Sequence, residues 1–332
     1  MSLPDDLPIQ TAALRAALPD EADWRTPCAA AGLSVRVDAA GNTFARWCPP
    51  RADASQPAVA TGAQLEDQDD DRAIGLVAGL EAIQTLQRLG FEPSRPIEIA
   101  RLVRSDDLAQ SDGAYHAWVG LQTEPSGKLE KQNASVGIAM SIIGSAGYRF
   151  RVTGEDGDAG AVPMPDRRDA LCAAAETIHA IEQLARSSPS IDLTATIARM
   201  DMIPAKPGTI PSEVTFDLEL HDTEAQNRNQ VAEAIHQEGH TIALRRGLKI
   251  TSEKQHARDP AACDQAVIDA IEQACDDADL RWWKTVGRST PEALSVARFA
   301  PVGLVLIPGD TDADLHVGVE VLTRTLAQLS TM

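Results

Sequence analysis

The segment from residue 146 to residue 254 runs in the order strand, helix, strand, strand, helix, strand. These six stretches are YRFRVTG (148–154), a helix over 166–184, LTATIARM (193–200), EVTFDLELH (213–221), a helix over 224–240 and ALRRGLKITS (243–252). A βαββαβ order builds a four-stranded antiparallel sheet with two helices on one face. We therefore expect this segment to fold as a unit of its own.

The flanking sequence indicates an α/β sheet on both sides of that segment. IEIARLV at 97–103 and VGLVLI at 302–307 are short apolar runs bounded by Pro, Gly or charge, as buried parallel strands are. Residues 74–89 place apolar side chains at helical spacing and stop at Gly90. LSVRVDAAGNTFARWC at 33–48 alternates around a Gly-Asn pair, as a hairpin does.

The order of these stretches predicts a domain inserted into a discontinuous one. Residues 1–140 and 256–332 form the outer domain, with a mostly parallel sheet flanked by helices, and residues 146–254 form the inserted domain. A short extended run at 57–61 and helices at 264–278 and 318–330 complete the outer domain. The length of 332 residues fits two domains at roughly 150 residues each.

Composition excludes several classes of partner. Asp and Glu number 49 against 30 Lys and Arg, and the net charge of -19 repels nucleic acid and anionic lipid. No apolar run approaches the roughly 18–20 residues that span a bilayer, and the start MSLPDDLPIQ lacks a secretory pattern, so we expect a cytoplasmic protein. Five cysteines without a C-x-x-C pair indicate free, buried thiols.

Common catalytic signatures are absent from the chain: it has no G-x-x-x-x-G-K, no strand-borne G-x-G-x-x-G and no G-x-S-x-G. His236 and His240 lie four residues apart and could share a metal, but the favoured interpretation is that the pair ends a helix, where a charged imidazole complements the helix dipole. The acidic run at 66–71 could gather a cation or be simply solvated.

Three stretches are similar to one enzyme family in content and in order: GLSVRVDAAGNTFARW (32–47), GLVAGLEAIQTLQRLG (75–90) and AGAVPMPDRRDALCAAAETIHAIEQLA (159–185). From about Gly32 to about Leu326 the chain resembles the L-carbamoylase and allantoate amidohydrolase branch of the zinc aminoacylase-carboxypeptidase family. The resemblance implies a zinc-peptidase-like fold with an inserted lid and dimerisation domain. It also implies a homodimer, a two-zinc centre that activates water, a glutamate general base, and a carbamoyl or ureido amino acid as substrate.

The resemblance assigns roles to four residues. Asp71 matches the metal-bridging aspartate, with Asp70 as the alternative because the preceding loop is shorter than in the family. The tandem glutamates of the family, general base and then metal ligand, correspond to Asp106 and Asp107 after the strand IEIARLV. His316 in the segment LHVGVE matches the closing imidazole ligand.

The family's other zinc loses both of its imidazoles in this alignment. The G-S-H-L-D segment is GAQLE here, so Gln64 replaces one histidine, and Gln122 in QTEPS replaces the other. We therefore expect one zinc or manganese ion, held by Asp71, Asp107 and His316, or no metal at all.

Three substrate-binding positions also differ. The H-A-G histidine that reaches the oxyanion is Asp158, the asparagine before I-P is Gly208, and the carboxylate-binding arginine of D-I-R is Glu219. These changes predict that hydrolysis of the C–N bond is lost or very weak, and that the protein binds an unknown small ligand or a partner. The alternative is an active one-metal hydrolase with Asp106 as its base, acting on an amide or ureido bond.

Overall fold

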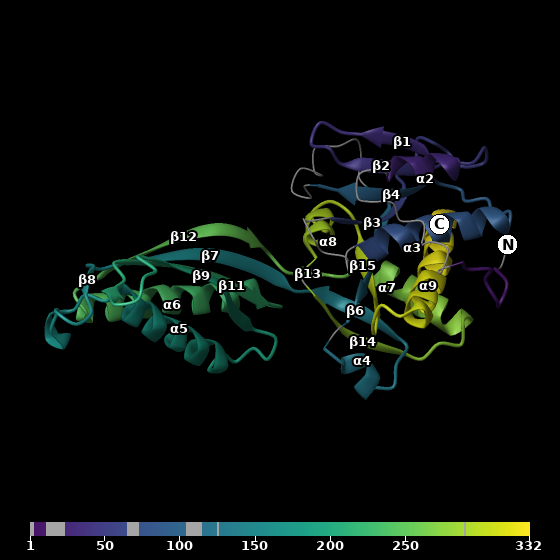
Figure 1. Ribbon diagram of the computed structural model, residues 1–332. Coiled ribbons are helices and arrows are strands. Elements are labelled where there is room, and N and C mark those ends of the chain that lie inside the picture. Colours follow the sequence, from purple (N-terminus) through teal and green to yellow (C-terminus); the bar gives the residue numbers. More distant parts are fainter. Residues whose placement is uncertain (1–2, 11–23, 65–72, 104–114, 125, 289) are drawn as a thin grey trace. The chain divides into compact units, whose positions relative to one another are not determined.

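The computed structural model describes residues 3–10, 24–64, 73–103, 115–124, 126–288 and 290–332. Figure 1 shows two compact units, which are Met1–Ile142 together with Ala261–Met332 (the main unit) and Ile143–Pro260 (the inserted unit). The boundaries expected from the sequence were residues 146 and 254 for the inserted unit.

A mostly parallel sheet forms the centre of the main unit. Its path is β1-β2-β4-β3-β5-β15-β6-β13, with β14 paired to β6. Strands β4, β3, β5 and β15 run parallel, whereas β2 joins β4 and β6 joins β15 in antiparallel fashion. The strands are β1 (Ser34–Val37), β2 (Thr43–Trp47), β3 (Val59–Gln64), β4 (Ile97–Leu102), β5 (Ala117–Thr123), β6 (Val136–Ile142), β13 (Ala261–Ala262), β14 (Trp282–Gly287) and β15 (Val302–Ile307).

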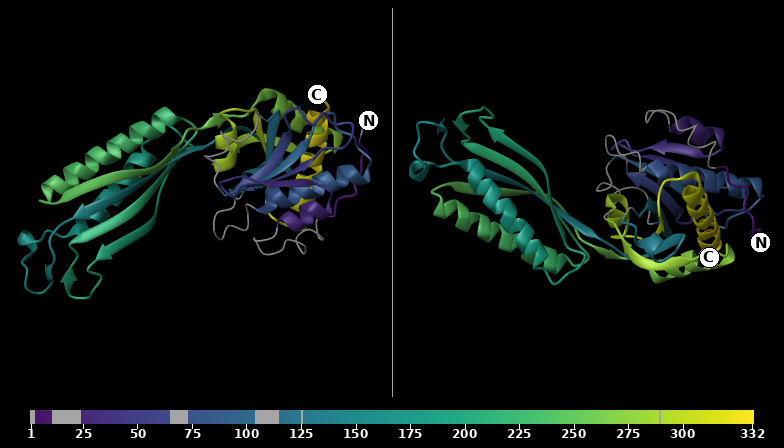
Figure 2. Two further views of the ribbon diagram at one scale, coloured as in Figure 1. Left: turned by 90° about the horizontal axis from the view of Figure 1, so that it is seen from above. Right: turned by 60° about the horizontal axis from the view of Figure 1, so that its bottom comes forward.

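Helices flank this sheet (Figure 2). On one face α3 packs against α9, which packs against α7, and all three contact the central strands. A Cβ atom at Gly75 would lie 2.8 Å from the backbone oxygen of Gly62, so the glycine lets α3 approach the end of β3 closely. The helices of the main unit are α2 (Arg25–Ala30), α3 (Ala73–Arg88), α4 (Lys128–Lys131), α7 (Gln265–Asp277), α8 (Pro291–Val296) and α9 (Asp312–Thr331).

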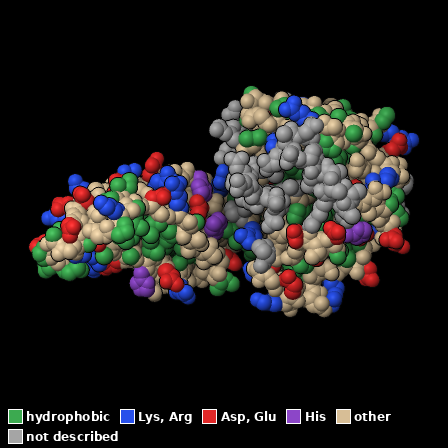
Figure 3. All heavy atoms as spheres, in the orientation of Figure 1, with side chains coloured by type: hydrophobic (Ala, Val, Ile, Leu, Met, Phe, Trp, Pro, Cys, Tyr) green, Lys and Arg blue, Asp and Glu red, His purple; other side chains and the backbone are tan. Residues whose placement is uncertain are grey.

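The inserted unit has the predicted βαββαβ order, and its sheet is antiparallel with the order β12-β7-β11-β9. Alternate residues of β11 are buried against the helices, and the others face away from the core. Figure 3 shows basic and acidic side chains interspersed over this unit. Its elements are β7 (Gly144–Thr153), β8 (Gly157–Asp158), a 3-10 turn (Met164–Asp166), α5 (Ala170–Arg186), β9 (Thr194–Ile203), β10 (Thr209–Ile210), β11 (Glu213–Asp222), α6 (Ala225–Arg245) and β12 (Lys249–Arg258).

Two boundaries of the inserted unit differ from the sequence prediction. Helix α5 begins at Ala170 rather than at 166, because the Asp169 carboxylate accepts hydrogen bonds from the Leu171 and Cys172 amides and caps the helix there. Helix α6 continues to Arg245, and β12 begins at Lys249 rather than at 243. Gly247, with a φ of 69°, ends that helix.

All five cysteines are free thiols, as predicted, but only three of them are buried. Burial raises the pKa of Cys28, Cys263 and Cys275 to about 12, which keeps these thiols protonated. Cys48 and Cys172 are exposed, contrary to the expectation. Among the described helices, none is both long and apolar enough to cross a membrane.

Candidate functional site

The strand order creates a topological switch point between β3 and β5. The chain passes from β3 through α3 to β4 on one side, and then to β5 on the other side of β3. Ligands of open α/β sheets bind outside the carboxyl ends of the strands at such a point. The ladder between β3 and β5 covers only Val59–Ala117 and Ala60–Trp118, so the strands separate towards their carboxyl ends.

Gln64 and Gln122 lie at this edge of the sheet. Gln64 is the last residue of β3, opposite Leu102 of β4, and it is 5% exposed. Gln122 is the penultimate residue of β5, opposite Leu306 of β15, and it is half-buried. The structure therefore places both glutamines that the resemblance aligns with imidazoles of the family at the carboxyl ends of neighbouring strands.

The side chain of Gln122 has a fixed orientation. Its Nε2 donates a hydrogen bond of 2.7 Å to Thr290 Oγ1, and the Thr290 hydroxyl donates one of 3.0 Å to the Arg288 carbonyl. A hydroxyl has a single proton, so a Thr290 that donates to Arg288 must accept from the Gln122 amide nitrogen. The carbonyl oxygen Oε1 of Gln122 then remains as an acceptor, with no hydrogen bond from any described residue.

Thr290 is the N-cap residue of α8, which contacts β3, β5 and β15. It is 4% exposed, and Pro291 occupies the first position of the helix. The sequence analysis missed this residue. A threonine followed by proline is a helix-start signal that could have located α8, but the contact with Gln122 crosses 168 residues and has no local signature.

Glu124 follows β5 and is turned towards its own loop. Its carboxylate accepts hydrogen bonds from the Ser126 hydroxyl and amide and from the Lys128 amide. Burial opposes ionisation, but the hydrogen bonds from Ser126, Lys128 and Leu129 outweigh it, and the pKa of Glu124 is lowered. The residue is 4% exposed, and its carboxylate organises the turn before α4.

His316 lies in the second turn of α9, the helix that follows the carboxyl end of β15, and it is half-buried. The other predicted site residues, Asp71, Asp106 and Asp107, lie outside the described residues, as does the whole acidic run at 66–71. Convergence of Asp71 and Asp107 with His316 therefore stays a prediction.

The described residues do not fit a two-zinc centre. Zinc in proteins is held by thiolate, imidazole or carboxylate ligands, whereas Gln64 and Gln122 offer neutral amides. The Nε2 of Gln122 is also engaged by Thr290. Within the described ranges, no three His, Cys, Asp or Glu side chains lie close enough together to hold a metal ion.

Two of the substituted substrate positions lie side by side in the inserted unit. Asp158 of β8 is opposite Thr209 of β10, and the Ala159 amide donates to the Gly208 carbonyl at 2.8 Å. The Asp158 carboxylate accepts from the backbone amides of Gly160 and Ala161 at 2.8 and 3.0 Å. It closes its own turn and, when ionised, offers acceptors only.

Glu219, the third such position, lies on β11 opposite Gly147 of β7. Its Oε2 is 3.3 Å from Nε2 of His256, and each side chain is about one-third exposed. A Cβ atom at Gly147 would collide with both side chains, so the glycine provides the space in which they meet. The negative charge of Glu219 thus stands beside an imidazole partner.

His236 and His240 do not cap a helix end, because α6 continues five residues beyond His240 to Arg245. His236 instead packs edge-on against Tyr148, with ring centroids 5.1 Å apart, and it also contacts Phe150. Burial lowers the pKa of His236 and favours its neutral form. The prediction that the pair ends a helix is therefore wrong, and the half-buried His236 packs against the aromatic side chains of β7 instead.

A scan against family models returned no match. The chain is 30% identical over 367 residues to a ureidoglycolate hydrolase of Oryza sativa subsp. japonica, covering 90% of this chain and 75% of the relative. It is 28% identical to an N-carbamoyl-L-amino acid amidohydrolase of Geobacillus stearothermophilus, covering 90% and 88%. The chain belongs to this amidohydrolase family.

A solved structure extends the amidohydrolase relationship to the whole fold. The crystal structure of AtUAH in complex with glyoxylate matches with a TM-score of 0.89 and 26% identity, and covers 98% of both chains. These findings confirm the resemblance and the predicted fold class. Amidohydrolases of this family typically depend on a metal.

Proposed function

We propose that this chain binds a small ureido or amide derivative of an amino acid at the carboxyl ends of β3 and β5, and hydrolyses its C–N bond very slowly or not at all. The observation that carries the proposal is the orientation of Gln122 by Thr290. The relatives named above are a ureidoglycolate hydrolase and an N-carbamoyl-L-amino acid amidohydrolase, which supports the ligand class.

The chemistry of Gln122 suits such a ligand. With Nε2 held by Thr290, its Oε1 is left as a hydrogen-bond acceptor at the carboxyl end of β5. A ureido or primary amide group carries N–H donors that such an oxygen can accept. A partly buried acceptor that is left unpaired costs about 1–3 kcal/mol, so a ligand N–H that satisfies it gains affinity.

The same residues argue against rapid hydrolysis. In this family's chemistry, metal ions lower the pKa of the attacking water and polarise the scissile carbonyl. Two of the required imidazoles are glutamines here, and an oxyanion donor is replaced by Asp158. Loss of one oxyanion donor alone costs about 100- to 1,000-fold in turnover.

The alternative function is one-metal hydrolysis, with Asp106 as general base and Asp71, Asp107 and His316 holding a zinc or manganese ion. The position of His316 supports it, because α9 begins beyond the carboxyl end of β15, next to β5. The position of β4 also supports one-metal hydrolysis, since Leu102 ends that strand four residues before Asp106.

Calorimetric titration with N-carbamoyl-L-alanine tests the proposal, with ammonia release measured on the same samples. We expect saturable binding without sustained turnover, and we expect Gln122→Met to weaken binding about tenfold through loss of the acceptor. Gln132→Met is the matched control, because Gln132 is exposed after α4. Equal binding by the Gln122 and Gln132 variants would remove Gln122 from the ligand site, and rapid ammonia release would favour the one-metal hydrolase.

A further inference from the structure

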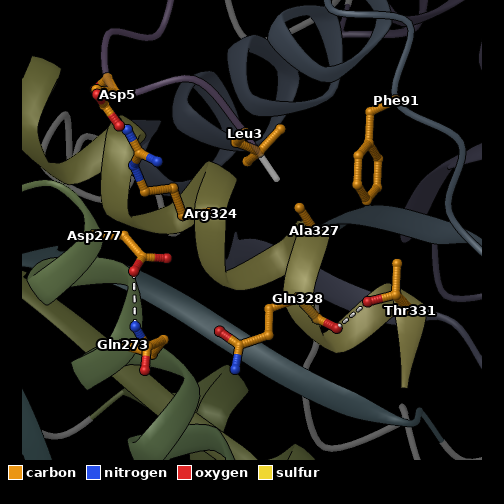
Figure 4. Close-up of a pocket in the computed structure, with 9 residues that line it drawn as sticks. All are labelled: Leu3, Asp5, Phe91, Gln273, Asp277, Arg324, Ala327, Gln328 and Thr331. Carbon is orange, nitrogen blue, oxygen red and sulfur yellow. Dashed lines mark hydrogen bonds between the residues drawn. The ribbon is translucent and has the colours of Figure 1, made fainter. Parts of the chain in front are cut away.

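The main unit has a hollow of about 440 Å³, whose lining does not include Gln122 (Figure 4). It is bounded by the N-terminal arm (residues 3–10), the segment after α3, α7 and the second half of α9. His316 precedes Arg324 by eight residues on α9, which is about 12 Å along the helix. The lining residues are Leu3, Asp5, Phe91, Gln273, Asp277, Arg324, Ala327, Gln328 and Thr331.

The volume suits a small ligand, because sites for small molecules occupy about 300–1,000 Å³. One side of the hollow is apolar and deep: Phe91 is 6% exposed and Ala327 is 4% exposed. Figure 4 shows Arg324, Asp277 and Gln273 on the side opposite Phe91. The hollow therefore has one apolar side and, opposite it, one polar and charged side.

Arg324 supplies a buried cation to the polar side of the hollow, opposite Phe91. It is 5% exposed, and its Nη2 donates to the carbonyls of Pro4 at 2.9 Å and Asp5 at 2.7 Å, which holds the N-terminal arm in place. Its Nε and Nη2 also donate to Glu320 and form an ion pair with it at 2.8 Å. All of these bonds use Nε and Nη2, and Nη1 donates to no described residue, which leaves its two N–H donors without a partner there.

Asp277 supplies the opposite charge. Its Oδ1 accepts from Gln273 Nε2 at 2.7 Å, and it forms no ion pair within the described part of the chain. The amide of Gln328 likewise has no partner there. A simple anion in the hollow would meet the carboxylates of Asp5 and Asp277, and a simple cation would leave the Nη1 donors of Arg324 unused, so neither alone matches both groups.

We propose that this hollow binds a free α-amino acid with an apolar side chain. The ligand carboxylate accepts from Nη1 of Arg324, its ammonium group donates to Asp277, and its side chain packs on Phe91 and Ala327. A zwitterion offers an acceptor to the Nη1 donors and a donor to the Asp277 carboxylate at once, and its apolar side chain covers the rest of the surface. The inference does not depend on the function proposed for the strand-end site.

The test is calorimetric titration of the full-length protein with L-phenylalanine and two analogues that each lack one charge. 3-Phenylpropionate has no ammonium group, and 2-phenylethylamine has no carboxylate. We expect one saturable site for L-phenylalanine and at least tenfold weaker binding of both analogues, because each loses a charge-assisted hydrogen bond.

Substitutions of lining residues test whether the ligand binds in the hollow. Ala327→Phe fills the space and should abolish binding, and Asp277→Asn should weaken it about tenfold. Asp279→Asn is the matched control: it removes the same charge two residues away, and asparagine tolerates the φ of 50° found there. Gln122→Met should leave this binding unchanged, which separates the hollow from the strand-end site.

Three results would overturn the proposal. One is absence of saturation at about 10 mM L-phenylalanine, tenfold above a millimolar Kd. Another is equal affinity for either singly charged analogue. The third is unchanged binding in both Ala327→Phe and Asp277→Asn, with circular dichroism showing that each variant is folded.

Discussion

Replacing Thr290 with valine removes one hydroxyl group and keeps the shape of the side chain. That hydroxyl accepts from Gln122 Nε2 at 2.7 Å and donates to the Arg288 carbonyl at 3.0 Å, at a position that is 4% exposed. The substitution therefore leaves one donor, the Gln122 amide, and one acceptor, the Arg288 carbonyl, without their partner at the edge of the candidate site.

The cost follows from the surroundings of those two groups. A buried unsatisfied polar group costs about 1–3 kcal/mol, but Gln122 is half-buried and Arg288 is exposed, so water replaces part of each bond. We expect a loss of about 2 kcal/mol in the free energy of unfolding, near the lower limit for two groups. For a unit of this size that corresponds to a fall of about 4–8 °C in Tm.

Ligand binding should fall as well, because the Gln122 amide can then turn its nitrogen towards the site. We expect the Kd for N-carbamoyl-L-alanine, measured by calorimetry, to rise about three- to tenfold. Thr290→Ser keeps the hydroxyl and should restore the native affinity. Thr285→Val on β14 is the control, because no described residue bonds to that hydroxyl.

The reasoning fails if Thr290→Val binds the ligand as tightly as the native protein. It also fails if Thr290→Ser weakens binding as much as Thr290→Val, since the effect would then come from packing and not from the hydrogen bond. A lower Tm without a change in the affinity for N-carbamoyl-L-alanine would limit Thr290 to a structural role.

Three further predictions concern the inserted unit. Arg228 is 1% exposed and donates to the carbonyls of Ser145 and Arg258, so Arg228→Met should lower the free energy of unfolding in urea by about 3–5 kcal/mol. Arg151→Met on the exposed face should lower it by less than about 1 kcal/mol, and equal losses in the two variants would contradict this account. The pKa of His236 in the fold lies below its ordinary 6.5, so the unfolded chain binds the extra proton and stability should fall as the pH drops below 6.5; His236→Phe should reduce that dependence in unfolding curves at pH 5 and 7. We also predict a two-fold dimer through this unit with α5 near the contact, and light scattering that shows a monomer at micromolar concentration would count against it.

The sequence predicted those parts of the fold that hydrophobic periodicity determines. The hairpin at 33–48, the helix at 74–89 and the strands at 97–103 and 302–307 appear as β1 with β2, α3, β4 and β15. The ends of helices that single side chains determine were harder to predict from the sequence. Asp169 caps α5 three residues beyond the expected start, and α6 continues past the expected end to Arg245.

The candidate site was predictable in part. Alignment with the family identified Gln64 and Gln122, and parallel strand order explains why they meet at one edge of the sheet. Thr290 was not predictable, because its contact with Gln122 depends on how α8 packs against strands far away in the sequence. His236 was misassigned, because its burial against Tyr148 is a tertiary contact that the spacing of two histidines does not encode.

The most direct test of the central claim is the number of metal ions per chain together with turnover. Protein purified without chelator is incubated with excess zinc or manganese, bound metal is measured by mass spectrometry, and ammonia release from N-carbamoyl-L-alanine is followed. With glutamines at positions 64 and 122, we predict at most one metal ion per chain and turnover far below about one per second. Two metal ions per chain, or turnover of about one per second or more, would contradict the account.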